Sequence, residues 1–303
     1  MLSFKKKAIK VNKHSYLQGF NSLKKYILIL ISVFLFSLTG SAQHKRKKSA
    51  EVGVFLGGSY YIGDLNPLVH FGPQTKPAGG VVFRYNLNPR LSARANGFFG
   101  TIQADDALSK DAGQQQRNLN FRSKITELSA QMEFNFLDYQ IGNEKRKFTP
   151  YIFLGIAMFK FNPQASINNN WISLQPLGTE GQGLEGGASR KKYKLLQVSI
   201  PFGVGIKTNL SKQIGLTIEW GMRKTFTDYL DDVSKTYYSP TALAAVHGNT
   251  AAQLSDRSLH TDPNYSNVGR QRGNPTTKDW YAFAGIILTL KLKEPRETCP
   301  GVN

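Results

Sequence analysis

The clearest pattern in this chain is an alternation of apolar and polar residues with a period of two. Every second residue is apolar across 196–206, and the alternation resumes across 214–222 after a short break at 209–212. A period of two predicts β-strands, and each run is about as long as a tilted strand that crosses a bilayer. The interleaved positions hold Glu219, Arg223 and several glycines, which suits a crowded polar interior better than open water.

The same alternation appears in six further segments of the chain. Segment 124–137 alternates most cleanly, whereas 148–160 is apolar on both faces, so its inward side is less clearly marked. Together with the first hairpin, these segments predict eight strands. The six are 50–60, 79–87, 91–102, 124–137, 148–160 and 279–292.

The connections between the predicted strands alternate in length. The first, third, fifth and seventh are long, and the second, fourth and sixth are short. Outer-membrane barrels place short turns at the periplasmic rim and long loops outside, and a soluble sandwich gives no reason for this alternation. We therefore predict an all-β, antiparallel outer-membrane β-barrel over 51–292, with both termini periplasmic. The loops 161–191 and 227–278 leave room for another hairpin, so ten strands remain an alternative to eight.

A barrel of eight strands has an interior just wide enough for side chains to fill. The inward-facing set predicted from the alternation contains four carboxylates and three guanidiniums, which can pair with one another in a plugged lumen. We interpret this set as structural, and a gated pore is the alternative. It consists of Glu51, Arg84, Arg94, Glu127, Glu133, Glu219 and Arg223.

The N-terminal region has the features of a secretory signal peptide. Lys24 and Lys25 precede a short apolar run that ends in small residues near Ala42, and seven lysines with no acidic residue lie in 1–43. The apolar run is too short for a spanning helix. We expect a signal peptide over 1–43, a basic leader over 44–50 and a periplasmic tail over 293–303. The only cysteine, Cys299, rules out an internal disulfide, and we assign it no role.

The whole chain has a net charge of +19. Without residues 1–43 it has 32 basic and 20 acidic residues, which is a net charge of +12. For an exported barrel, the basic leader is a solvated segment or, as the alternative, a contact with lipid head groups or a periplasmic partner, and we expect no nucleic-acid partner.

Acidic residues and histidines in the long loops raise two further hypotheses. The acidic residues where the seventh strand ends (Asp228, Asp231 and Asp232) favour a structured turn over a calcium site, because they lack a complete loop pattern. Asp231 and Asp232 share a loop with His247 and His260, as an outer-membrane protease would require, but nothing positions a water. We expect no enzyme, no cofactor and no metal site.

Six segments carry a resemblance to a known family: 51–67, 132–140, 146–159, 200–210, 223–234 and 279–292. In this order they resemble the PorG-like outer-membrane barrels of Bacteroidetes, which supply a component of the type IX secretion system. The resemblance covers most of 51–292, although the loops 161–191 and 227–278 are long for the family and the tail ETCPGVN extends past the last strand. It implies a non-enzymatic barrel associated with the periplasmic ring of a machine for protein transport and gliding.

The leading hypothesis is therefore a structural or anchoring component of the type IX machinery. Its partners would be outer-membrane lipid and the periplasmic ring lipoproteins. The contact surfaces would be the turns 138–147 and 209–212, the leader and the tail, and the foremost candidate contact residues are Lys145, Arg146 and Lys147. The alternatives are a small surface barrel acting through its long loops as an adhesin or ligand binder, and a narrow channel.

Overall fold

The computed structural model describes residues 48–184, 190–262 and 264–292. The predicted signal peptide, most of the basic leader, the tail and Cys299 lie outside these residues. Among the described residues, no helix is long and apolar enough to span a membrane.

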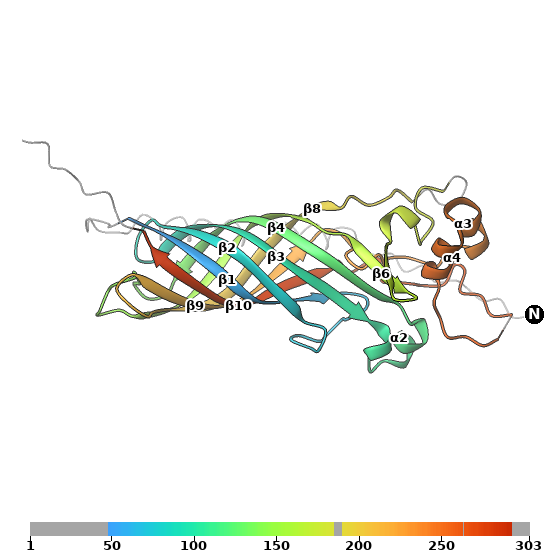
Figure 1. The fold of residues 1–303 in the computed structure, drawn as a ribbon, viewed down its shortest axis with the longest axis horizontal. Helices are drawn as coiled ribbons and strands as arrows, with labels where there is room; N and C mark the ends of the chain where they lie inside the picture. The colour runs from blue at the N-terminus through green and yellow to red at the C-terminus, as the bar shows by residue number, and fades with distance from the viewer. Residues whose placement is uncertain (1–47, 185–189, 263, 293–303) are drawn as a thin grey trace, which may run out of the picture. The chain divides into compact units, whose positions relative to one another are not determined.

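Eight antiparallel strands form a closed barrel (Figure 1). The pairing runs β3-β2-β1-β10-β9-β8-β5-β4, and a further pairing of β3 with β4 closes the ring. Closure leaves no unpaired edge, which a lipid environment requires. The strands are β1 (Ser49–Ile62), β2 (Lys76–Asn86), β3 (Leu91–Asp105), β4 (Asn120–Asn135), β5 (Phe148–Lys160), β8 (Leu196–Asn209), β9 (Ile214–Thr225) and β10 (Trp280–Lys291).

The predicted fold class is confirmed, and the alternative count of ten strands has a structural counterpart. A short hairpin, β6 (Pro163–Ile167) and β7 (Asn170–Ser173), lies in the loop after β5. β6 pairs with β4 at only two residue pairs, Arg122–Gln164 and Ser123–Pro163. The sheet thus has ten strands, of which eight close the barrel.

The outward face of the barrel is apolar over most of its height. Outward side chains on every barrel strand are exposed, for example Leu56 at 61%, Leu128 at 64% and Ile156 at 71%. An exposed apolar surface that encircles a whole sheet is unusual for a soluble monomer and typical of a surface in contact with lipid. On β5, Ile152, Leu154, Ile156 and Met158 face outward, as the alternation predicts.

The inward face makes room for large rings by placing glycines opposite them. A Cβ atom on Gly205 would lie 2.5 Å from the Tyr151 ring, and one on Gly203 or Gly221 would lie within 2.7 Å of the Phe153 ring. The glycines on the inward face of β8 and β9 therefore accommodate the aromatic side chains of β5.

The long connections gather at one end of the barrel and form what we call the loop cap (63–75, 106–119, 161–195 and 226–279, where described) (Figure 1). The loop cap contains the β6–β7 hairpin, short helices and two small apolar cores, one around Leu174 and Leu254 and one around Leu184 and Leu243. The helices are η1 (Asp106–Leu108), α2 (Ala112–Arg117), η2 (Gln175–Leu177), α3 (Pro240–His247) and α4 (Asn249–Ser255). The sequence pattern predicts loops in these connections, so the helices are a difference between the prediction and the structure.

Candidate functional site

Near the short connections between the strands, the ion pairs of the lumen are organised around one carboxylate, Glu133 on β4. It pairs with Arg84 at 2.8 Å, with Arg94 at 2.9 Å and with Lys207 at 2.5 Å. Arg84 also binds Glu51 at 2.6 Å. These groups come from five different strands, β1, β2, β3, β4 and β8, so the ion pairs tie the barrel wall together across its interior.

Arg94 extends this network to the opposite wall. Its guanidinium donates to Glu219 on β9 and to Gln131 on β4, and the Tyr151 hydroxyl donates to the same Glu219 carboxylate. Arg94 also lies over the Phe153 ring, with Cζ 4.9 Å from the ring centroid. The planar guanidinium thus contacts a carboxylate, a side-chain amide and an aromatic face at the same time.

A second ion pair lies separately in the lumen. Arg223 donates to Glu127 at 3.0 Å, and the Tyr281 hydroxyl donates to the same carboxylate at 2.9 Å. Arg223 also lies 4.8 Å from the centroid of the Phe283 ring.

The structure places all seven residues predicted for the lumen inside it, each at most 3% exposed. Lys207, which is 1% exposed, is the functional residue that sequence analysis missed. The four carboxylates and three guanidiniums leave one negative charge uncompensated, and Lys207 lies on the inward-facing set of β8. That imbalance was the signal that could have identified it. The lumen network is Glu51, Arg84, Arg94, Glu127, Glu133, Lys207, Glu219 and Arg223.

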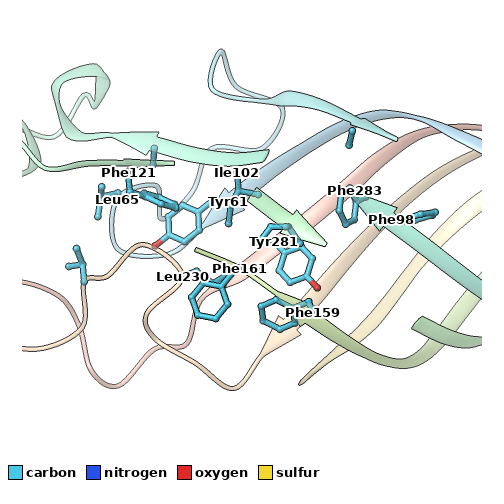
Figure 2. Packing of buried hydrophobic residues seen from close by; sticks show 14 of the residues in the cluster. Tyr61, Leu65, Phe98, Ile102, Phe121, Phe159, Phe161, Leu230, Tyr281 and Phe283 are labelled. Atoms are coloured by element: carbon cyan, nitrogen blue, oxygen red, sulfur yellow. The ribbon is translucent and has the colours of Figure 1, made fainter. Parts of the chain in front are cut away.

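An aromatic cluster fills the loop end of the lumen (Figure 2). Phe98 and Phe283 pack edge to face with ring centroids 5.4 Å apart, and the Phe159 and Tyr281 centroids are 5.1 Å apart. Tyr61, Phe121 and Leu230 continue the cluster into the loop cap. The lumen is therefore filled by ion pairs and by aromatic rings, and its charged groups have almost no contact with solvent.

The loop cap holds buried carboxylates directly above these rings. The Tyr61 hydroxyl donates to Asp231 at 2.5 Å and to Asp279 at 3.0 Å. Arg272 pairs with Glu180 at 3.2 Å, and Asp232 accepts from the Tyr193 hydroxyl at 2.7 Å. The predicted turn at the end of the seventh strand is thus a buried structural element of the loop cap.

Burial shifts the titration of these carboxyl groups. Desolvation, with repulsion from Asp279, raises the pKa of Asp231 well above its usual range. Desolvation also raises the pKa of Asp232 to about 6, although Arg272 opposes the shift, and raises the pKa of Asp228 to about 6. Each of these groups therefore keeps its proton to a higher pH in the folded cap than an exposed aspartate does.

Neither the calcium hypothesis nor the protease hypothesis gains support from this geometry. Within residues 48–184, 190–262 and 264–292, no group of three or more His, Cys, Asp or Glu side chains could hold a metal ion. Asp231 and Asp232 accept hydrogen bonds from Tyr61, Val233, Thr179 and Tyr193. His260 instead stacks on Tyr265, with ring centroids 3.6 Å apart.

The short connections form the opposite end of the barrel, which we call the short-turn rim (87–90, 136–147 and 210–213). Lys145, Arg146 and Lys147 are exposed there, as expected for a contact surface. Arg146 forms an ion pair with Asp138, and Arg90 binds the same carboxylate at 2.7 Å. These ion pairs link two neighbouring turns and leave Lys145 and Lys147 as the outward-facing cations of the predicted partner contact.

Solved structures of similar proteins are outer-membrane barrels. OprG of Pseudomonas aeruginosa aligns with a TM-score of 0.40 and 10% identity over 82% of this chain and 99% of its own. Ail of Yersinia pestis, solved with the heparin analogue sucrose octasulfate, aligns with a TM-score of 0.35 and 10% identity over 82% of this chain and 100% of its own. TM-scores this low support no inference about function, so the barrel assignment depends on the strand pairing of this chain.

No curated protein matches the chain. A family model does match, over residues 24–253, and its description is "Domain of unknown function (DUF6089)". The matched residues include seven of the eight barrel strands and the greater part of the loop cap. The chain therefore belongs to the DUF6089 family.

Proposed function

We propose that this protein is a non-enzymatic outer-membrane barrel that anchors a component of the type IX secretion machinery through its short-turn rim. The observation that carries the proposal is the closed lumen, whose charged groups are all at most 3% exposed. A barrel whose described lumen is filled by side chains acts through its rims and its outer wall. The resemblance of its strands to the PorG-like barrels supports a partner among periplasmic ring lipoproteins.

The short-turn rim has the properties that such a contact requires. The turn around Gly142 packs against the turn around Lys212, and Asn209 donates its side-chain amide to the Gln140 carbonyl at 3.1 Å. This packing holds Lys145 and Lys147 on a defined surface. Charged side chains at the edge of an interface mainly govern the rate of encounter and the choice of partner.

The test is affinity purification of the tagged protein from its own outer membrane after Lys145→Glu and Lys147→Glu substitution. Arg146 stays unchanged because its ion pair with Asp138 orders the turn. We expect periplasmic ring lipoproteins to co-purify with the wild type. Their recovery with the double variant should fall about tenfold or more, because reversing the charge at two positions of the contact disfavours the complex. The barrel should remain heat-modifiable on gels.

A matched control, Lys110→Glu with Lys235→Glu, places the same charge change on exposed lysines of the loop cap. It should co-purify the ring proteins as the wild type does. Equal recovery of ring proteins with both double variants, or none with the wild type, would contradict the proposal.

One observation favours the alternative, a surface barrel that binds ligands through its loops. The loop cap contains a polar cavity of about 650 Å³ lined by residues that include Arg117, His260, Tyr265 and Arg270. A variant of this cavity must keep Arg272, because removal of Arg272 would leave Glu180 buried without its cation. Tyr265→Ala with Arg270→Ala changes the cavity and spares that pair. Under the leading proposal, secretion survives this double substitution.

A further inference from the structure

The exposed charges on the barrel wall are distributed unequally between its two ends. All four glutamates of the barrel strands face the lumen, and the strands' one aspartate, Asp105, accepts a hydrogen bond from the Ala107 amide at the start of η1. The exposed strand lysines, Lys124, Lys160 and Lys224, all lie at the loop end. The outer wall therefore presents positive charge without opposing negative charge at one end only.

Two of these lysines lie on adjacent strands, Lys124 on β4 and Lys160 on β5, and β8 separates β5 from β9, which carries Lys224. Lys160 on β5 is opposite Thr126 on β4 and Leu196 on β8. Lys124 is two residues further toward the loops on β4, and such a diagonal neighbour of Lys160 has its Cα about 7 to 8 Å away. Lys194 is an exposed residue of the loop cap, two residues before β8 begins at Leu196. Within the described part of the chain, none of these lysines forms an ion pair.

Lys224 extends the row to β9, where it is opposite Ile200 and Trp280. Its Nζ lies 5.8 Å from the centroid of the Trp280 ring. We call Lys124, Lys160, Lys194 and Lys224 the lysine arc. It extends along four consecutive strands of the barrel, β4, β5, β8 and β9, which make up half of the eight-strand ring.

The lysine arc lies at the boundary of the apolar wall. Toward the barrel centre, the next outward side chains include Leu128, Met158 and Val198, which are 64%, 48% and 56% exposed. Toward the loops, Arg122 stacks over the Trp171 ring at 4.0 Å. Cations and aromatic residues directly above an apolar band are typical of the level of lipid head groups, where lysine stems lie along the wall and the ammonium groups reach the polar layer.

We propose that the lysine arc binds the phosphate groups of a phosphorylated glycolipid in the outer leaflet. This inference depends on insertion of the barrel in the outer membrane with its long loops outward, and it is independent of any secretion partner. Three exposed lysines at the loop ends of neighbouring strands, with no ion-pair partner among the described residues, complement the negative charge of a phosphate monoester. The exposed apolar side chains nearer the barrel centre offer contact for the acyl chains. The arc would hold lipid on one half of the barrel.

The arc is tested with purified barrel in mixed micelles and two probes, lipid A and the same lipid with its phosphates removed. The variant is Lys124→Gln with Lys160→Gln and Lys194→Gln. Each basic residue near an anionic surface contributes about 1 kcal/mol, so we expect the triple variant to bind lipid A about a hundredfold more weakly. The dephosphorylated lipid should bind the wild type and the triple variant equally, and inorganic phosphate should not displace lipid A.

Two further variants keep the experiment decisive. Arginine at the three positions retains the charge and should retain binding, whereas Lys110→Gln with Lys191→Gln and Lys235→Gln removes the same charge from the loop cap and should leave binding unchanged. Equal binding of lipid A by the wild type and the glutamine variant of the arc would overturn the inference, as would equal wild-type affinity for both lipids. Heat-modifiability of every variant separates these outcomes from failure of the barrel itself.

Discussion

At the scale of single residues, the protein concentrates its buried charge on Glu133. One carboxylate faces three cations, Arg84, Arg94 and Lys207, and all four side chains are at most 2% exposed. Removing one member of a buried ion pair leaves an uncompensated charge, which costs far more than the pair contributes relative to an apolar core.

We predict that Glu133→Gln lowers the free energy of unfolding by about 3 to 5 kcal/mol, because three cations lose their shared partner. Urea titration of the folded, faster-migrating gel form in micelles measures the loss. Glu144→Gln is the control, since Glu144 pairs with Lys212 at 3.4 Å on an exposed turn and exposed pairs contribute about 0 to 1 kcal/mol. Equal stability of the two variants would contradict a structural role for the lumen network.

Sequence alternation predicted seven residues of the lumen network because a strand turns successive side chains to opposite faces. It did not identify Lys207, which lies near the end of β8 where lumen and rim cannot be separated from the pattern alone. It also could not show which carboxylate each cation binds, because pairing across the lumen depends on the register between strands that are distant in sequence, such as β3 and β9 for Arg94 and Glu219.

At the scale of elements, the short-turn rim depends on one glycine conformation. Gly142 has φ +89°, and a Cβ atom there would lie 2.6 Å from the Lys212 carbonyl oxygen of the neighbouring turn. Both the positive φ and the close approach exclude a side chain.

We predict that Gly142→Ala separates these two turns and lowers stability by about 1 to 2 kcal/mol. Hydrogen exchange of the amides in 138–147 and 209–213 should increase, while exchange in the loop cap stays unchanged. Gly269→Ala is a matched control: Gly269 also has a positive φ, +79°, but nothing lies within 4 Å of its Cβ position. Unchanged exchange at the short-turn rim of the Gly142 variant would show that the turns do not depend on this contact.

The loop cap is the element whose stability should vary with pH. The folded pKa of Asp232 is about 6, above its usual value of 3.8, so the folded cap binds more protons than the unfolded chain between these values. The contribution of Asp232 to the stability of the cap is therefore greatest below about pH 4 and is lost as pH rises through about 6. The pKa shift of Asp232 alone corresponds to a change of about 3 kcal/mol in the free energy of unfolding between these two pH ranges.

Protection factors of the amides in 228–234, measured at about pH 4 and about pH 7, test this dependence. We expect lower protection at the higher pH in the wild type. Asp231→Asn should reduce the fall, because it removes a carboxylate that repels Asp279. The exposed loop carboxylate Asp262 provides the control, and Asp262→Asn should behave as the wild type. A rise in protection with pH would contradict the assignment of these carboxyl groups.

The strands could be predicted almost entirely from sequence, whereas the loop cap could not. Segment 148–160 has the predicted bounds, and the other strands differ only at their ends. The cap contains α3 and α4, which span only Pro240–His247 and Asn249–Ser255, and helices this short depend on tertiary packing rather than on a periodic pattern. Their apolar residues, Leu243 and Leu254, pack into separate small cores, so no continuous stripe marks them.

At the scale of the whole molecule, the barrel has a filled interior and two charged regions on its outside. The lumen network and the aromatic cluster close the interior, the lysine arc marks one boundary of the apolar wall, and the short-turn rim carries Lys145 and Lys147 at the other end. β1 begins and β10 ends at this same rim, since the Leu292 amide donates to the Ala50 carbonyl at 2.8 Å. Both described ends of the chain therefore lie at the rim that carries the proposed partner contact.

The central claim is that the short-turn rim, and not the loop cap, contacts the partner. Site-specific photo-cross-linking in living cells tests it most directly, with a photoreactive residue replacing Lys145 in one strain and Lys235 in another. We predict a specific cross-link to a periplasmic ring lipoprotein from position 145 and none from position 235. A specific partner captured from position 235 while position 145 captures none would contradict the account and would assign the function to the loop cap.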